Sequence, residues 1–226
     1  MTTASIDTGL NAYFEELAEH LPNFSPEDQR TALTIYRELA KGDPMSDVEL
    51  AQALGVTTAE AHERRSSPAL KGITYLDSED RIIGFGGLAT IPMHHEFLVN
   101  GRKVWTWCAW DSLFIPELLG AEARVVSPDP RTQTPVRLTV TPAGVRAVDP
   151  PTAVVSFIRT HADVFAKSAE NVMASFCHYV FFFESRESGE AWTSEHPDTF
   201  LVSMDDALVL TRRLNARNFG GALTGS

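Results

Sequence analysis

Two cysteines and one aspartate are the candidate reactive residues of this 226-residue chain. Cys108 and Asp111 lie three positions apart in an otherwise apolar segment, and Cys177 is the second of only two cysteines. A thiolate attacks electrophiles and binds soft metals, and a carboxyl group that stays protonated near neutral pH can donate a proton. The cysteines are 69 positions apart, so they can meet only through the fold. Their spacing is compatible with a thiol pair for a soft metal and also with two ordinary buried cysteines.

The segment around Cys108 predicts a junction between a strand and a helix. Residues alternate in a strand-like way from Arg102 to Trp107, and the polar pair Asp111-Ser112 is typical of a helix N-cap. The free N–H groups and positive end of such a helix favour a thiolate over a thiol. The neighbouring tryptophans act in the opposite direction, because burial raises the pKa of both a cysteine and an aspartic acid.

The second cysteine lies in a run of β-forming residues, 173–183, which predicts a strand. With the period of two of a strand, Cys177 points into an aromatic layer, whereas Phe176 and His178 share the opposite face. We expect the walls of a pocket near the thiols to come from the aromatic neighbours of the two cysteines: Trp107, Trp110, Phe176 and His178.

The rest of the chain predicts an α+β fold, with flanking helices around antiparallel or mixed sheets. Expected strands are 89–91, 95–99, 102–107, 123–127, 136–141, 145–148 and 153–158, and expected helices are 115–119, 162–171, 189–196 and 204–216. Asn100-Gly101 is a strong signal for a two-residue hairpin turn. The adjacent pair His94-His95 would point to opposite faces of a strand and is a poor chelating pair.

The first 83 residues predict a winged-helix-like unit that packs on a core formed by residues 84–226. Helices are expected at 10–21 and 26–40, and two capping boxes beginning at Ser46 and Thr57 open two further helices on either side of Gly55. Residues 73–76 and 81–85 then flank an acidic turn, as in a hairpin or wing.

Charge argues against a nucleic-acid partner for this unit. Residues 1–80 contain six Lys and Arg against fifteen Asp and Glu, a balance of −9, and the whole chain has a net charge of −11. Because DNA affinity depends on neutralising phosphates with cations, such a surface would repel DNA.

Composition and the absence of other motifs limit the remaining classes of function. The chain has 43% hydrophobic residues, no apolar run long enough to span a membrane, and no signal-like segment at residues 1–9, so we expect a cytoplasmic protein. In a reducing compartment, two cysteines are more often functional thiols or core residues than a disulfide. The chain contains no phosphate-binding glycine loop and no Cys-x-x-Cys pair, and no motif implies a cofactor.

The segment WCAWDSLFIP at residues 107–116 resembles the corresponding motif of the organomercurial (alkylmercury) lyases. The second cysteine segment, from Ser175 to Phe182, is similar to theirs in order and spacing, as are residues 37–42 and 135–140. The resemblance covers roughly residues 30–210, and the cysteine motifs are its specific part. It implies a winged-helix-like N-terminal unit on a catalytic core.

The resemblance also implies a reaction, namely protonolysis of a carbon–mercury bond. Cys108 would attack the organomercurial as a thiolate, Cys177 would supply a second sulfur, and Asp111 would shuttle the proton. The products would be a hydrocarbon and Hg(II) held by both cysteines, with Asp111 as an oxygen ligand. External thiols such as glutathione or cysteine would remove the metal, or the protein would pass it to a mercuric reductase. The protein is expected to be a monomer or a homodimer.

This chain departs from the family pattern at two positions. Some members carry another cysteine where this chain has His178, and many have one in the loop at residues 127–130. Two alternatives stay open beside the lyase. One is a soft-metal (Hg or Cu) binding or sensing relative without turnover, and the other, from the winged-helix pattern, is a regulator whose β domain senses a ligand.

Overall fold

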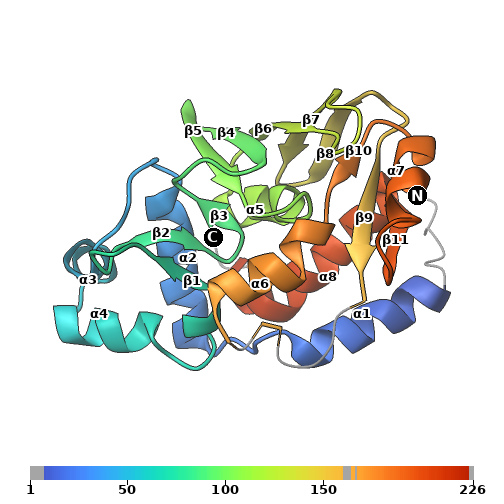
Figure 1. Cartoon of the computed structure of the whole chain (residues 1–226). Coiled ribbons are helices and arrows are strands. Elements are labelled where there is room, and N and C mark those ends of the chain that lie inside the picture. The colour runs from blue at the N-terminus through green and yellow to red at the C-terminus, as the bar shows by residue number, and fades with distance from the viewer. Residues whose placement is uncertain (1–7, 160–163, 166, 224–226) are drawn as a thin grey trace.

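The computed structural model describes residues 8–159, 164–165 and 167–223, which form two antiparallel sheets with helices around them (Figure 1). The large sheet has the strand order β1-β2-β3-β5-β4-β6-β7-β8, and the small one has the order β10-β9-β11. The predicted α+β architecture is confirmed. Within the described ranges, no helix is both long enough and apolar enough to cross a membrane.

The large sheet is built mainly from neighbours in the sequence. Asn100 and Gly101 both have positive φ (51° and 74°), which confirms the hairpin predicted between β4 and β5. Strands β4, β6 and β7 alternate buried and less buried residues, so one face of the sheet packs on the core. Its strands are β1 (Thr74–Leu76), β2 (Ile82–Phe85), β3 (Leu88–Ala89), β4 (His95–Val99), β5 (Arg102–Thr106), β6 (Ala123–Pro128), β7 (Pro135–Thr141) and β8 (Gly144–Asp149).

The small sheet closes the other side of the core. It consists of β9 (Val154–Ile158), β10 (Phe182–Phe183) and β11 (Thr199–Ser203). Strand β11 was not predicted, because its five residues follow a Pro-Asp turn and alternate too briefly to stand out.

Three of the N-terminal helices, α2 to α4, begin at a capping box. Ser25, Ser46 and Thr57 each accept a backbone N–H and complete a capping box, and Gly55 ends a helix in the left-handed conformation. The helices are α1 (Thr8–His20), α2 (Pro26–Leu39), α3 (Asp47–Leu54) and α4 (Thr58–Arg65). The boundary expected after residue 83 falls within β2, which pairs with both β1 and β3.

Of the later helices, those at residues 111–119 and 204–223 lie in the middle of the molecule, whereas the one at residues 186–193 lies at its edge (Figure 1). Helix α5 (Asp111–Leu119) packs against both the large sheet and α8 (Met204–Leu223), while α7 (Arg186–Thr193) packs on the small sheet. Helix α5 begins at the polar pair that the sequence indicated as a helix start, four residues before the range 115–119 predicted for the helix. Helix α7 begins three residues earlier than predicted, and α8 extends further. The helix expected at 162–171 begins among residues outside the described ranges, and the described helix α6 is Ala169–Ser175.

The strand predicted over residues 173–183 is wrong. The chain instead forms the end of α6, a 3₁₀ turn at Cys177–Tyr179 and only the two-residue strand β10. Ser168 caps α6 by accepting the N–H of Asn171 (3.2 Å), and α6 ends just before Cys177. The period of a short apolar run does not distinguish a strand from a buried helical segment. Here the run continues from α6 as a 3₁₀ turn.

Candidate active site

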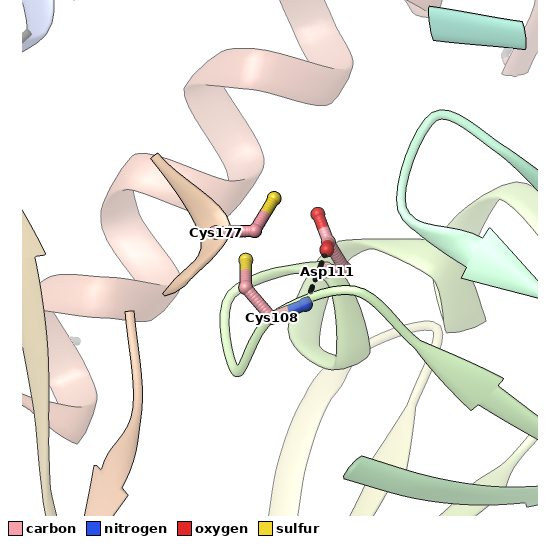
Figure 2. A group of neighbouring side chains, drawn as sticks. All are labelled: Cys108, Asp111 and Cys177. Carbon is pink, nitrogen blue, oxygen red and sulfur yellow. Dashed lines mark hydrogen bonds between the residues drawn. The ribbon is translucent and has the colours of Figure 1, made fainter. Parts of the chain in front are cut away.

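Cys108, Asp111 and Cys177 converge in the middle of the fold. Their sulfur and carboxylate oxygen atoms all lie within 4.8 Å of one another, and all three residues are buried. Figure 2 shows the two thiols side by side, with the Asp111 carboxyl facing them from the start of α5. The fold therefore brings together all three residues that the sequence singled out for chemistry.

The link between β5 and α5 fixes the first two members of this triad. The backbone N–H of Cys108 donates to Oδ2 of Asp111 (2.8 Å), drawn as a dashed line in Figure 2. The carbonyl of Cys108 accepts from the hydroxyl of Thr106 (3.0 Å), and the N–H of Ala109 donates to the carbonyl of Val180 (3.0 Å). This last bond ties the Cys108 loop directly to the segment that follows Cys177.

The predicted helix start is confirmed, but Asp111 does not cap the helix as expected. The N-cap is Trp110, whose side chain makes no capping bond, and Asp111 is the first helical residue. Its carboxylate turns back toward Cys108, because that N–H offers a partner at 2.8 Å. The carboxyl group is thereby held beside the thiols.

Burial dominates the protonation of the three groups. It raises the pKa of Asp111 to about 7, although hydrogen bonds from the side chain and backbone of Cys108 act in the opposite direction. Burial also raises the pKa of Cys177, and raises that of Cys108 well above its ordinary value. The rise in the pKa of cysteine and aspartic acid that the sequence predicted from burial is therefore found at all three groups. Near neutral pH both cysteines are thiols and Asp111 is poised between its acid and base forms.

A mostly apolar cavity of about 80 Å³ opens onto the triad. Asp111 and Cys177 form part of its wall, whereas Cys108 is fully buried and does not line it. Three of the four predicted wall residues line this cavity: Trp107, Trp110 and Phe176. His178 does not, because the 3₁₀ turn directs it outward and leaves it exposed.

Several residues of the cavity wall were missed by sequence reasoning. Tyr36 comes from α2, Gly86 and Gly87 from the turn between β2 and β3, and Asn215 from α8. None of these residues is itself a thiol or a carboxylate, so residue type gave no reason to single them out. The Gly86-Gly87 pair was the one available signal, because adjacent glycines between two strands mark a turn or a close approach of backbone.

The histidine pair His94-His95 and the loop at residues 127–130 make their contacts with residues outside the triad. His95 is buried, and its Nδ1 lies 2.8 Å from the Ser127 hydroxyl, while His94 Nε2 lies 2.8 Å from the carbonyl of Pro128. In the loop at residues 127–130, the buried carboxylate of Asp129 accepts from the N–H of Glu184 (3.0 Å) and the hydroxyl of Ser188 (2.8 Å). These contacts tie the loop to β10 and α7.

The fold and the site define a class of protein: an α+β protein with a buried centre of two thiols and one carboxyl group. Two thiols suit a soft metal, and a carboxyl group with a pKa near 7 suits the transfer of a proton at that metal.

Comparison with known proteins identifies this class. Residues 88–215 match the alkylmercury lyase family. An alkylmercury lyase of Streptomyces lividans is 39% identical over 176 residues, which are 78% of this chain and 77% of the relative. One of Pseudomonas putida is 36% identical over 202 residues, 88% of this chain and 90% of the relative. The chain belongs to the alkylmercury lyase family.

A solved structure shares the fold. The mercury-bound form of MerB2 superposes with a TM-score of 0.71 at 22% identity, covering 92% of this chain and 98% of that one.

Proposed function

We propose that this protein is an enzyme that cleaves the carbon–mercury bond of organomercurials by protonolysis, giving a hydrocarbon and Hg(II). One observation carries the proposal: in a member of the alkylmercury lyase family, Cys108, Asp111 and Cys177 meet within 4.8 Å, and two of them, Asp111 and Cys177, form part of the wall of an apolar cavity. The cavity suits an organic substituent, and the thiols suit mercury, which prefers sulfur to oxygen or nitrogen ligands.

The first step is capture of the mercurial by the thiols. Cys108 loses its proton to the Asp111 carboxylate and forms a sulfur–mercury bond, while the ligand that the mercurial brought, a small thiolate, departs. Cys177 binds as the second sulfur, and its proton leaves with that departing thiolate. Asp111 is suited to accept the proton because its pKa is about 7 and it interacts directly with Cys108.

The second step breaks the carbon–mercury bond. Two sulfur ligands raise the electron density on the carbon, which takes the bonding pair and the proton held by Asp111. The products are one hydrocarbon and Hg(II) bound by Cys108 and Cys177, with Asp111 as a further oxygen ligand. Mercury stays divalent throughout, so the reaction requires no redox cofactor.

Removal of Hg(II) completes the cycle. Low-molecular-weight thiols such as glutathione or cysteine exchange with the two protein thiols, or the metal passes to a mercuric reductase. Because this exchange depends on abundant free thiols, we place the enzyme in the cytoplasm.

We propose that residues 1–83 act as a winged-helix-like unit on the catalytic core of residues 84–226. Helices α3 and α4, joined at Gly55 and followed by the β1–β2 hairpin, support this division. The unit contributes Leu21, Phe24 and Tyr36 to the cavity, so its role is to cover the site and not to bind nucleic acid.

A soft-metal binding protein without turnover is the second candidate, favoured by the thiol pair alone. Single-turnover reaction with phenylmercury, with benzene followed by gas chromatography, separates the two. The native protein should release one benzene per site, and Cys108→Ser none. Asp111→Ala should keep the mercurial bound yet release benzene at least a hundred-fold more slowly, since general-acid groups contribute about 10²–10⁴-fold. Stoichiometric binding by the native protein without benzene would favour the metal-binding candidate.

A further inference from the structure

We infer that the Gly86-Gly87 turn, held by Tyr36 of α2, is a positioning device that sets the Asp111 carboxyl for proton delivery. The inference rests on the proposed lyase function. It assigns Gly87 and Tyr36 roles that act through Asp111, without contact with the reacting carbon.

The turn leaves no space for side chains. Both glycines have positive φ (48° and 100°), which side chains rarely tolerate. A Cβ on Gly87 would overlap the Cγ and Oδ1 atoms of Asp111 and lie 2.7 Å from its Cβ. One on Gly86 would overlap the Tyr36 hydroxyl and lie 3.2 Å from its Cζ. The backbone of Gly87 is thus the surface against which the Asp111 carboxyl rests.

Three hydrogen bonds from different elements hold the turn. The Tyr36 hydroxyl donates to the carbonyl of Gly86 (2.7 Å), the N–H of Gly86 donates to the carbonyl of Ile73 (2.9 Å), and the N–H of Trp107 donates to the carbonyl of Gly87 (2.8 Å). Trp107 is the residue before Cys108, so the turn is tied to the same loop that carries the first thiol.

These contacts confine Asp111 from two sides. The Cys108 N–H fixes Oδ2, and the backbone of Gly87 faces Oδ1, so the carboxyl group has little freedom to rotate away from the thiols. Correct placement of a proton donor is worth a large share of a rate enhancement, and a misplacement of about 1 Å costs on the order of 10²-fold. Tyr36 belongs to α2, so the N-terminal unit helps to orient the acid as well as to cover the cavity.

Gly87→Ala tests this directly, with Gly42→Ala as the matched control. Gly42 has the same backbone strain (φ 101° against 100°), but a Cβ there meets no atom within 4 Å. Both variants carry the same backbone strain, so Gly87→Ala should lose more stability on thermal unfolding than Gly42→Ala only by the cost of its overlap with Asp111, and both should still bind phenylmercury stoichiometrically. In a single turnover, benzene release should fall at least ten-fold in Gly87→Ala and stay at the native rate in Gly42→Ala. Native release by Gly87→Ala, or an equal loss in Gly42→Ala, would overturn the inference.

A second pair of variants covers the case in which Gly87→Ala does not fold. Tyr36→Phe keeps the ring and removes the bond to Gly86, and Tyr13→Phe removes a comparable bond from a buried tyrosine hydroxyl to the carbonyl of Ile158 (3.0 Å). We expect a several-fold lower kcat with unchanged KM in Tyr36→Phe and native values in Tyr13→Phe. An unchanged kcat in Tyr36→Phe would contradict the role given to Tyr36. Absence of benzene from the native protein would instead contradict the lyase function itself.

Discussion

Asp111 is the residue at which chemistry and stability oppose each other. Its pKa rises from 3.8 to about 7 on burial, so the folded protein holds a proton that the unfolded chain releases near pH 4. A raised acid pKa contributes stability that is present below pH 4 and is lost as pH rises through about 7. At neutral and higher pH, the ionised carboxylate therefore strains the fold that positions it.

Asp111→Asn should relieve this strain, because the amide keeps the shape of the side chain and carries no charge. With about 1.4 kcal/mol per pKa unit, the variant should gain stability relative to the native protein between about pH 4 and pH 8, with a ceiling of roughly 4 kcal/mol. Urea unfolding at both ends of that range measures the difference. A stability difference that does not change with pH would contradict the raised pKa.

The capture step should depend on the same ionisation. Because only the ionised Asp111 accepts the proton of Cys108, the rate of phenylmercury capture should rise with pH through about 7. Stopped-flow tryptophan fluorescence, with Trp107 and Trp110 beside the thiols, follows this step. Asp111→Asn should show no such rise in the same range, and a native profile as flat as that of the variant would exclude Asp111 as the base.

At the scale of elements, contact between α5 and α8 holds the start of α5 in place. The indole N–H of Trp110 donates to the buried hydroxyl of Thr211 (3.0 Å), and Asn215 donates to the carbonyl of Phe114 (3.1 Å). Trp110 directly precedes Asp111, so the position of α8 bears on the acid.

Thr211→Val should therefore leave the Trp110 N–H buried without a partner while nearly preserving volume. The expected loss is about 1–3 kcal/mol in the free energy of unfolding. Thr211→Ser retains the hydroxyl and serves as the control in the same denaturation experiment. Native stability in Thr211→Val, or a loss no larger than that of Thr211→Ser, would contradict the contribution assigned to the hydrogen bond.

The success of sequence-based prediction also varied by element. The capping boxes at Ser46 and Thr57, the Asn100-Gly101 hairpin and the helix beginning at Asp111 were predictable because their signals lie within a few residues. The conformation around Cys177 was not, since an apolar run buried on several sides carries no clear period. The inward direction of Cys177 and the outward direction of His178 follow from the 3₁₀ turn instead.

At the scale of the whole molecule, the site exists only in the folded chain. Cys108 follows a strand of the large sheet, and Cys177 precedes one of the small sheet. The residue types indicated Cys108, Asp111 and Cys177 as candidates, and the family resemblance implied their roles. The short distances among the three side chains are a property of the tertiary fold. The contact of Gly87 with Asp111 could not be predicted from the sequence for the same reason. It joins the turn between β2 and β3 to the start of α5, which follows β5.

Binding of Hg(II) should accordingly stabilise the folded protein. A ligand that binds the native state more tightly than the unfolded chain raises the melting temperature, and only the native state presents both thiols together. One equivalent of Hg(II) should raise the melting temperature of the native protein well above that of Cys108→Ser or Cys177→Ser treated alike. Equal shifts in all three proteins would indicate binding by single thiols.

The isotopic composition of the hydrocarbon reports most directly whether the protein delivers a proton to the carbon bound to mercury. Phenylmercury treated with the native protein in heavy water should give benzene carrying one deuterium, with one Hg(II) bound per active site until excess thiol is added to remove it. Asp111→Asn, which cannot deliver a proton, should give bound phenylmercury and no benzene above the uncatalysed rate. Unchanged phenylmercury recovered from the native protein, or benzene formed equally fast by Asp111→Asn, would contradict proton delivery to carbon at the site formed by Cys108, Asp111 and Cys177.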